Sequence, residues 1–206
     1  MDRAAARKRD LVWITRCAID GGADVIQLRD KTASIPQLLE EAKRLRAVTR
    51  AAHVPLIIND HVDVAVAVGA EGVHLGQEDL PVSVARTRLG KGTLIGKSTH
   101  SLEQAVAADQ EALDYLAVGP LYSTPTKPDS VSVGLPLIQQ VRNRVSKPIV
   151  TIGGIDPATL PDVLAAGATC VAVVRAVCGA DDPQAAAENL KRTIRQFSRT
   201  ADSRRL

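Results

Sequence analysis

The strongest constraint on the fold is a series of short apolar segments that contain few polar residues. Nearly continuous apolar runs of this length are typical of strands buried on both faces, as in a parallel sheet. Seven such segments occur along the chain: DVIQL (24–28), PLIIN (55–59), GVHL (72–75), TLIG (93–96), DYLAV (114–118), PIVTI (148–152) and CVAVV (170–174).

Helical patterns lie between these segments. Residues 36–52 place apolar side chains on one stripe. Ser101 is a suitable N-cap for the helix that begins LEQAVAA, and Asp156 with Pro157 is a suitable start for another, which Gly167 ends. The alternation of strands and helices predicts an α/β chain with a parallel sheet.

The residues that follow the apolar segments indicate a barrel. Almost every segment ends in polar residues or glycine, and functional residues spread over many strand ends are typical of a TIM-type (β/α)8 barrel. A doubly wound fold binds its ligand at one switch point and commonly carries GxGxxG, which the sequence lacks. We therefore predict one (β/α)8 barrel domain over residues 1–198 and a basic, disordered tail over residues 199–206.

The number of strands is one short of eight. Residues 4–20 are best explained as a helix that ends at Gly21-Gly22, although LVWIT within them could form a strand. The sequence leaves open whether the first strand is missing from this chain. A gap in the barrel would expose two strand edges and part of the core.

Composition limits the function and the cellular compartment. Aromatic residues make up 2% of the 206 residues, which counts against single-stranded nucleic acid as a ligand. The net charge is +3, and the basic residues gather near both ends of the chain. Three cysteines have no metal-site spacing, and no apolar run reaches the ~18 residues of a membrane helix. We expect a cytoplasmic protein without nucleic-acid or membrane partners, and the sequence leaves a homo-oligomer open.

Two groups of cations and hydroxyls suit phosphates. Arg29 and Lys31 lie two residues apart at a strand end, an arrangement that fits a diphosphate, although a solvated charged turn is the alternative. The loop GPLYSTPTKPD, residues 119–129, carries Thr124, Thr126 and Lys127. A plain turn does not need these three side chains, whereas an anion such as phosphate would bind to them.

Asp60 and Asp79 end two successive strands, so their carboxylates could approach each other. Two carboxylates, with water and phosphate oxygens in the other positions, are a common Mg²⁺ site. The alternative for Asp60 is that it caps the following helix. His61 and His74 lack partners for a zinc site, so we expect them to pack or to form hydrogen bonds.

A second phosphate site is predicted at two later strand ends. Gly153-Gly154 follows PIVTI, and bare glycines let a ligand contact the backbone. Val174-Arg175 ends the last apolar segment. In (β/α)8 barrels the loops after the seventh and eighth strands frequently bind phosphate.

The segments QLRDK, IIND, HLGQEDLP, IGKSTH, GPLYSTPTK, PIVTIGGI and VAVVRA occur in this order. Together they resemble the thiamine phosphate synthase family. The resemblance implies a transferase that joins 4-amino-2-methyl-5-hydroxymethylpyrimidine diphosphate to 4-methyl-5-hydroxyethylthiazole phosphate, with Mg²⁺ as the cofactor. Thiamine phosphate and pyrophosphate would be the products of a dissociative reaction in which pyrophosphate leaves first.

The resemblance also implies roles for individual residues. Asp60 and Asp79 would be the Mg²⁺ ligands, and Arg29, Lys31 and Lys127 would be the catalytic cations. The implied substrate contacts are Gln27, Leu28, Arg29, Asp30, Lys31, Asn59, Ser98, Thr124, Pro125, Thr126, Lys127, Gly154, Val174 and Arg175.

Two residues depart from the family pattern or add to it. Arg175 stands where many members have serine, and an arginine can still bind phosphate. Lys97 adds a cation beside Ser98. The alternative functions are a thiazole tautomerase-like relative, which would need no diphosphate site, and a non-catalytic barrel truncated at its N-terminus.

Overall fold

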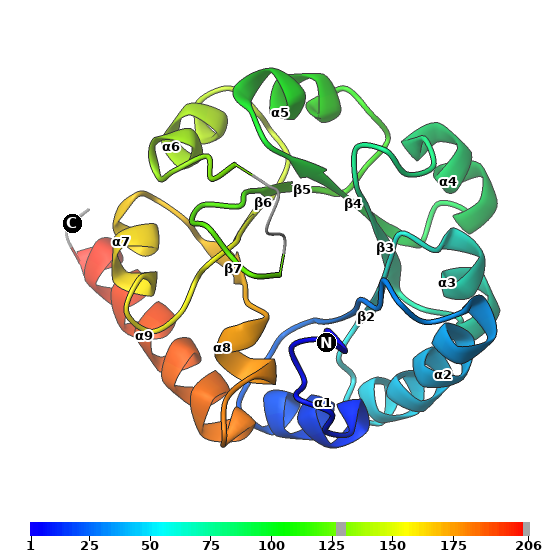
Figure 1. The fold of residues 1–206 in the computed structure, drawn as a ribbon. Coiled ribbons are helices and arrows are strands. Elements are labelled where there is room, and N and C mark those ends of the chain that lie inside the picture. The colour runs from blue at the N-terminus through cyan, green and yellow to red at the C-terminus, as the bar shows by residue number, and fades with distance from the viewer. Residues whose placement is uncertain (127–130, 204–206) are drawn as a thin grey trace.

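The computed structural model describes residues 1–126 and 131–203, and its strands form one parallel sheet (Figure 1). The strands lie in chain order, β1-β2-β3-β4-β5-β6-β7, and each pairs in parallel with the next. Their bounds are β1 Ile26–Leu28, β2 Leu56–Asn59, β3 Gly72–Leu75, β4 Leu94–Thr99, β5 Tyr115–Val118, β6 Ile149–Ile152 and β7 Cys170–Ala172.

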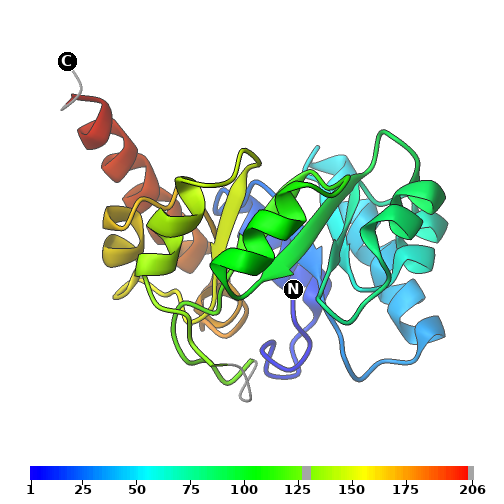
Figure 2. The ribbon, with the colours of Figure 1, turned by 90° about the horizontal axis from the view of Figure 1, so that it is seen from above.

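The helices surround the sheet as a ring, which Figure 1 shows in a view along the barrel. Figure 2 shows the end of the last helix, α9, projecting beyond the barrel. The bounds are α1 Leu11–Asp20, α2 Ile35–Ala51, α3 Val62–Val68, α4 Val82–Leu89, α5 Leu102–Asp109, α6 Pro136–Arg142, α7 Leu160–Ala165, α8 Arg175–Cys178 and α9 Pro183–Ser203.

Alternation along the strands separates two layers of side chains. One set faces the helices and is fully buried in the main core, for example Leu56 and Ile58 of β2 and Leu116 of β5. The other set faces the inside of the barrel. Ile57 and Ala117 belong to it, and they are buried outside that main core.

The sheet does not close into a complete ring within the described residues. No strand pairing joins β7 to β1 there. Cys170 of β7 is exposed, and Asp2 forms a single parallel bridge to Arg29 beside β1. The structure is therefore a barrel-like fold of seven strands with an open side, which Figure 1 shows near α1 and α8. The predicted parallel α/β barrel is confirmed, without a paired first strand in the described part of the chain.

Most predicted elements are confirmed, and each of the seven apolar segments contains a strand. Ser101 caps α5 by accepting a hydrogen bond from the Gln104 amide. The helix predicted over residues 4–20 is too long, because Asp10 caps α1 and residues 3–8 form turns. Asp156 caps a turn over residues 157–159, and α7 begins only at Leu160.

The last helix extends past the expected end of the domain. Helix α9 continues to Ser203, beyond residue 198, where we expected the domain to end. Residues 204–206 lie outside the described part of the chain. No helix in the described ranges is both long and apolar enough to cross a membrane. The three cysteines, Cys17, Cys170 and Cys178, are free.

Gly96 provides a test of packing inside the barrel. A Cβ at this position would lie 2.0 Å from Cζ of the Tyr115 ring on the neighbouring strand. We expect Gly96→Ala to displace the ring and to destabilise the fold by about 1–3 kcal/mol, as overpacking does. Thermal unfolding measures the effect. Gly92→Ala is the matched control, because no atom lies within 4 Å of its Cβ position. Equal melting temperatures for the two variants would contradict this packing.

Candidate active site

The candidate site lies at the carboxyl ends of the strands. In a parallel sheet these ends all meet at one face of the barrel. Figure 2 shows that the N-terminal segment and the loop after β5 both extend from the same face. Residues that are far apart in the sequence therefore meet there.

Lys31, Asp60 and Asp79 form the centre of the site. The Lys31 ammonium forms an ion pair with Oδ2 of Asp60, and the Asp60 side chain is largely buried. Asp79 lies beside Asp60, and the two carboxyl groups share a hydrogen bond. Oδ2 of Asp79 also accepts a hydrogen bond of 2.6 Å from the Gly76 amide. The predicted approach of the two carboxylates is present in the structure.

The two carboxyl groups differ in acidity because their surroundings differ. Burial and the hydrogen bond to Asp60 raise the pKa of Asp79. Burial opposes ionisation of Asp60 as well, but the hydrogen bond from Asp79 and the Lys31 ammonium outweigh it and lower the pKa of Asp60. Two carboxyl groups at hydrogen-bond distance repel each other when both are ionised, and a bound cation relieves this repulsion.

Asp60 does not cap the following helix, which was the alternative explanation of its position. The N-cap of α3 is His61, and Asp60 has a positive φ of 66°. The Asp60 amide donates to the carbonyl of His74. This left-handed backbone turns the carboxyl group of Asp60 out of the strand direction and toward Lys31 and Asp79.

Arg29 has a partner that the sequence did not predict. Its Nη1 atom donates a hydrogen bond of 2.6 Å to Oδ2 of Asp2, whose residue is 3% exposed. The Arg29 amide donates to the Met1 carbonyl, and the Met1 ammonium donates to the carbonyl of Gln27. The N-terminal residues therefore hold the Arg29 guanidinium at the same end of the barrel as Lys31.

The remaining residues of the first predicted segment point in different directions. The Leu28 side chain is fully buried in the main core, so only its backbone could contact a ligand. Oδ1 of Asp30 accepts hydrogen bonds from the Thr32 and Ala33 amides, which shape the turn before α2. Burial opposes ionisation of Asp30, but these bonds outweigh it and lower the pKa of this carboxyl group. Gln27 is half-buried in β1.

Ser98 lies inside the barrel next to His74. Its hydroxyl group lies 2.9 Å from Nε2 of His74, and Nδ1 of His74 lies 3.0 Å from the Tyr115 hydroxyl group. Asn59 pairs with His74 in the register of β2 and β3, so both side chains leave the sheet on the same side. The expectation that His74 forms hydrogen bonds is confirmed. Tyr115 was not identified from the sequence. Pairing of the fifth apolar segment with the fourth could have placed Tyr115 beside Gly96.

The loop after β5 packs against the glycine pair after β6. The Tyr122 amide donates to the Gly153 carbonyl, and a Cβ at Gly154 would lie 2.6 Å from the Tyr122 Cβ. Both glycines have positive φ angles. Thr124 and Thr126 lie further along this loop, where the Thr126 amide donates to Oγ1 of Thr124.

The other predicted residues of this second region are also placed by the structure, with one exception. Pro125 is exposed in the same loop. Val174 precedes α8 as its N-cap, and Arg175, the first residue of α8, is exposed. Arg175 forms no ion pair with another described residue. Lys127 lies outside the described residues.

Lys97 does not belong to the candidate site, which corrects the idea that it adds a cation beside Ser98. Adjacent residues of a strand point to opposite faces. Nζ of Lys97 forms an ion pair of 2.6 Å with Glu111, which follows α5 on the outside of the barrel. Its charge is therefore neutralised away from Ser98.

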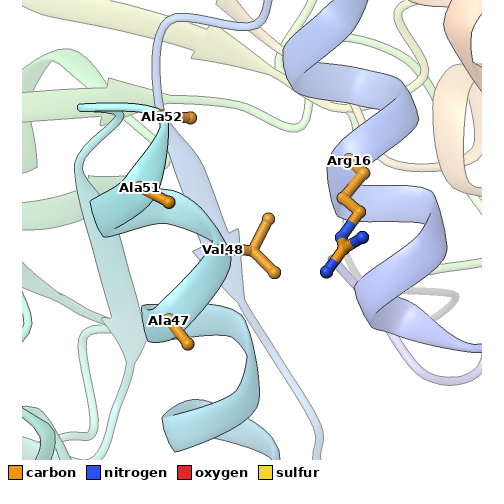
Figure 3. A pocket seen from close by; sticks show the side chains of 5 residues that line it. All are labelled: Arg16, Ala47, Val48, Ala51 and Ala52. Atoms are coloured by element: carbon orange, nitrogen blue, oxygen red, sulfur yellow. The ribbon is translucent and has the colours of Figure 1, made fainter.

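A surface pocket elsewhere contains none of the predicted site residues. It has a volume of about 330 Å³ and lies between α1 and α2, where Arg16 faces a short apolar stretch of α2 (Figure 3). Its lining residues are Arg16, Ala47, Val48, Ala51 and Ala52.

No cluster of three or more His, Cys, Asp or Glu side chains suited to a metal occurs among the described residues. A metal at the candidate site would need ligands from a substrate or water in addition to the two aspartates.

Comparisons with known proteins agree with the resemblance seen in the sequence. A family model described as thiamine monophosphate synthase matches residues 1–177. A thiamine-phosphate synthase from Chloroflexus aurantiacus is 49% identical over 194 residues, which cover 94% of this chain and 89% of that protein. A thiamine-phosphate synthase from Natronomonas pharaonis is 44% identical over 185 residues, which cover 88% and 86% of the two chains.

A solved structure supports the same relationship. The thiamine phosphate pyrophosphorylase from Pyrococcus furiosus matches with a TM-score of 0.86 and 37% identity, over 93% of this chain and 92% of that one. The family model covers far more than half of the chain, and the similarity to the relatives extends over most of their length. The chain belongs to the thiamine monophosphate synthase family.

Proposed function

We propose that the thiamine-phosphate synthase activity of this chain uses the cluster of Lys31, Asp60 and Asp79 to bind a pyrimidine diphosphate. The observation that carries the proposal is the pair of carboxyl groups that share a hydrogen bond beside an ammonium group at the strand ends. Family membership gives the class of reaction, a transfer that forms thiamine phosphate. The substrates would be the aminopyrimidine diphosphate and the thiazole phosphate.

The donor set fits Mg²⁺, because this ion prefers carboxylate oxygens and completes its shell with water and substrate phosphates. Asp60 and Asp79 would hold it. Mg²⁺ would supply positive charge that stabilises the negative charge of the departing pyrophosphate. Both carboxyl groups would be ionised when the ion binds, and Lys31 would remain beside Asp60.

The protein's own cations would bind the rest of the diphosphate. Lys31 and Arg29 lie at the same end of the barrel, and each is already held by a carboxylate. Ser98 would add a hydroxyl donor from β4. Lys127, which lies outside the described residues, is proposed as a further cation on the basis of the family pattern.

The second phosphate would bind at the region formed by the loops after β5, β6 and β7. Gly154 has no side chain that would shield its backbone amide from a ligand, and a Cβ at this position would lie 2.6 Å from the Tyr122 Cβ. Thr124 and Thr126 supply hydroxyl groups, and Arg175 is an exposed cation. These groups suit the phosphate of the thiazole substrate.

The chemistry needs charge stabilisation rather than a strong base. The bond between the pyrimidine methylene carbon and the diphosphate oxygen breaks, and its electron pair leaves with pyrophosphate. The thiazole nitrogen then donates its lone pair to the methylene carbon, and the positive charge ends on the thiazolium ring. Fixed cations that face the leaving group lower the barrier to such a step.

The free cysteines are consistent with a reducing compartment, and we propose the cytoplasm.

The first test is the formation of thiamine phosphate by the purified chain from both substrates. We expect product with Mg²⁺ and loss of product with EDTA, because the two aspartates need a cation to neutralise the leaving pyrophosphate. Recovery of activity when Mg²⁺ is added back would exclude damage by the chelator. Full activity in EDTA would contradict the metal assignment, and a folded chain without product under any condition would contradict the proposed function.

The metal ligands are tested by Asp79→Asn. We expect at least a hundred-fold loss of Mg²⁺-dependent turnover with little change in melting temperature, because the substitution removes one anionic ligand but keeps the size of the side chain. Asp63→Asn is the matched control, since Asp63 is an exposed aspartate on α3 that pairs with Arg88 at the surface. The assignment fails if Asp79→Asn keeps the turnover and Mg²⁺ dependence of the control.

The two phosphate regions are separated by comparing Lys31→Gln with Arg175→Gln. We expect Lys31→Gln to raise the KM for the pyrimidine diphosphate and Arg175→Gln to raise the KM for the thiazole phosphate, each by about ten-fold. A charge-assisted hydrogen bond contributes roughly 1.5–3 kcal/mol, so ten-fold is a low estimate. Steady-state kinetics with each substrate varied in turn measure both constants. The assignment of the regions is wrong if both variants affect the same substrate.

A further inference from the structure

We propose that Tyr115 and His74 are positioning residues that hold the Ser98 hydroxyl group as a hydrogen-bond donor to the pyrimidine diphosphate. The inference rests on the proposed function, in which Ser98 contacts the diphosphate. It adds two residues, one from β3 and one from β5, whose side chains act through Ser98 rather than on the substrate.

The three side chains form a continuous chain of hydrogen bonds across neighbouring strands. The Tyr115 hydroxyl group lies 3.0 Å from Nδ1 of His74, and Nε2 of His74 lies 2.9 Å from Oγ of Ser98. The register places Gly96 opposite both His74 and Tyr115. Since paired residues of parallel strands point the same way, all three side chains face the inside of the barrel.

The surroundings favour this arrangement over a chance contact. His74 is 7% exposed and Ser98 is 9% exposed, so their polar groups need partners within the protein. Gly96 leaves the space that the Tyr115 ring occupies. The rings of His74 and Tyr115 stack with centroids 5.6 Å apart. Burial, with a smaller effect from Asp114, raises the pKa of Tyr115, so its hydroxyl group keeps its proton.

The direction of the hydrogen bonds follows from the ligand. Phosphate oxygens only accept hydrogen bonds, so Ser98 can bind them only by donating its single hydroxyl proton. Its oxygen must then accept a hydrogen bond from His74, which requires the proton on Nε2. In the neutral imidazole Nδ1 then lacks a proton and accepts from Tyr115. Because a phenol hydroxyl group is a stronger donor than acceptor, Tyr115 thus favours the tautomer of His74 that leaves the Ser98 proton for the substrate.

Without the Tyr115 hydroxyl group, this selection is lost. The imidazole proton can then move to Nδ1, and Nε2 becomes an acceptor that takes the Ser98 proton. If the Ser98 proton points at His74, Ser98 presents only lone pairs to the phosphate. These lone pairs repel the phosphate oxygens. The effect should therefore be felt in binding of the diphosphate rather than in the overall fold.

The experiment compares Tyr115→Phe, Ser98→Ala and the double variant by steady-state kinetics. We expect Tyr115→Phe to raise the KM for the pyrimidine diphosphate about three- to ten-fold, the range for one hydrogen bond. The KM for the thiazole phosphate should stay unchanged. In the double variant the two effects should not multiply, because Tyr115 acts through Ser98.

A spectroscopic measurement tests the tautomer directly. We expect ¹⁵N NMR of histidine-labelled protein to show His74 protonated at Nε2 in the wild type and shifted toward Nδ1 in Tyr115→Phe. His53→Asn is the control variant, because it removes an exposed imidazole. Asparagine is chosen because His53 has a positive φ, which asparagine tolerates. The wild-type and Ser98→Ala spectra can be interpreted even if Tyr115→Phe fails to fold.

The outcomes separate this inference from the proposed function. An Nδ1-protonated His74 in the wild type, or fully multiplicative effects in the double variant, would overturn the inference while leaving the function in place. An unchanged KM in Ser98→Ala would overturn it as well. A wild-type chain that makes no thiamine phosphate would count against the proposed function, and the tautomer of His74 together with the affinity for inorganic pyrophosphate would then decide the inference.

Discussion

The in-register parallel pairing of the seven strands is the constraint on which the site depends. Each strand pairs with the next one in the chain, so every carboxyl end lies at the same face. The alternation of side chains then puts mostly apolar residues against the helices, and it places the polar side chains of His74 and Ser98 inside the barrel with Ile57 and Ala117. His74, Ser98 and Tyr115 meet only because β3, β4 and β5 share this register. A shift of one residue in β4 would turn Ser98 to the helices and bring Lys97 into the barrel.

The cluster of Asp60 and Asp79 is unfavourable for folding on its own. Two neighbouring carboxyl groups cannot both ionise cheaply, and burial together with the hydrogen bond to Asp60 raises the pKa of Asp79 as a result. Lys31 and the Gly76 amide offset part of this cost. Asp60 also needs a left-handed backbone, which is uncommon for residues other than glycine. Strain and like charge at one place are typical of a site built for a ligand rather than for stability.

The sequence was sufficient for the architecture and for the chemical groups, but not for all of their partners. Continuous apolar segments identify buried parallel strands, because both faces of such strands are covered. The approach of Asp60 to Asp79 followed from their places at successive strand ends.

The contact of Asp2 with Arg29 was missed, since it joins residues 27 positions apart through one isolated bridge without a periodic pattern. The predicted direction of Lys97 was wrong. It was inferred from the neighbouring Ser98, whereas the alternation of side chains along β4 places Lys97 on the opposite face. The start of α1 was misplaced because the capping role of Asp10 depends on a local backbone angle.

Arg29 and Lys31, the cations proposed to bind the diphosphate, are each held by a carboxylate. Two free cations at one end of a barrel would repel each other and move into solvent. Here Asp2 fixes the guanidinium and Asp60 fixes the ammonium. Arg29 and Asp2 are both largely buried, which reduces screening of that pair by water, whereas the Lys31 side chain is half exposed. Under the proposed function, a diphosphate would meet donors that are already oriented, and little reorganisation would be needed as charge builds up on the leaving oxygen. Arg175 lacks such a partner among the described residues and is exposed, so ordering its side chain would cost conformational entropy when the second phosphate binds. Under the proposed function, the cations held by carboxylates would face the bond that breaks, and the cation without a described partner would hold the other substrate.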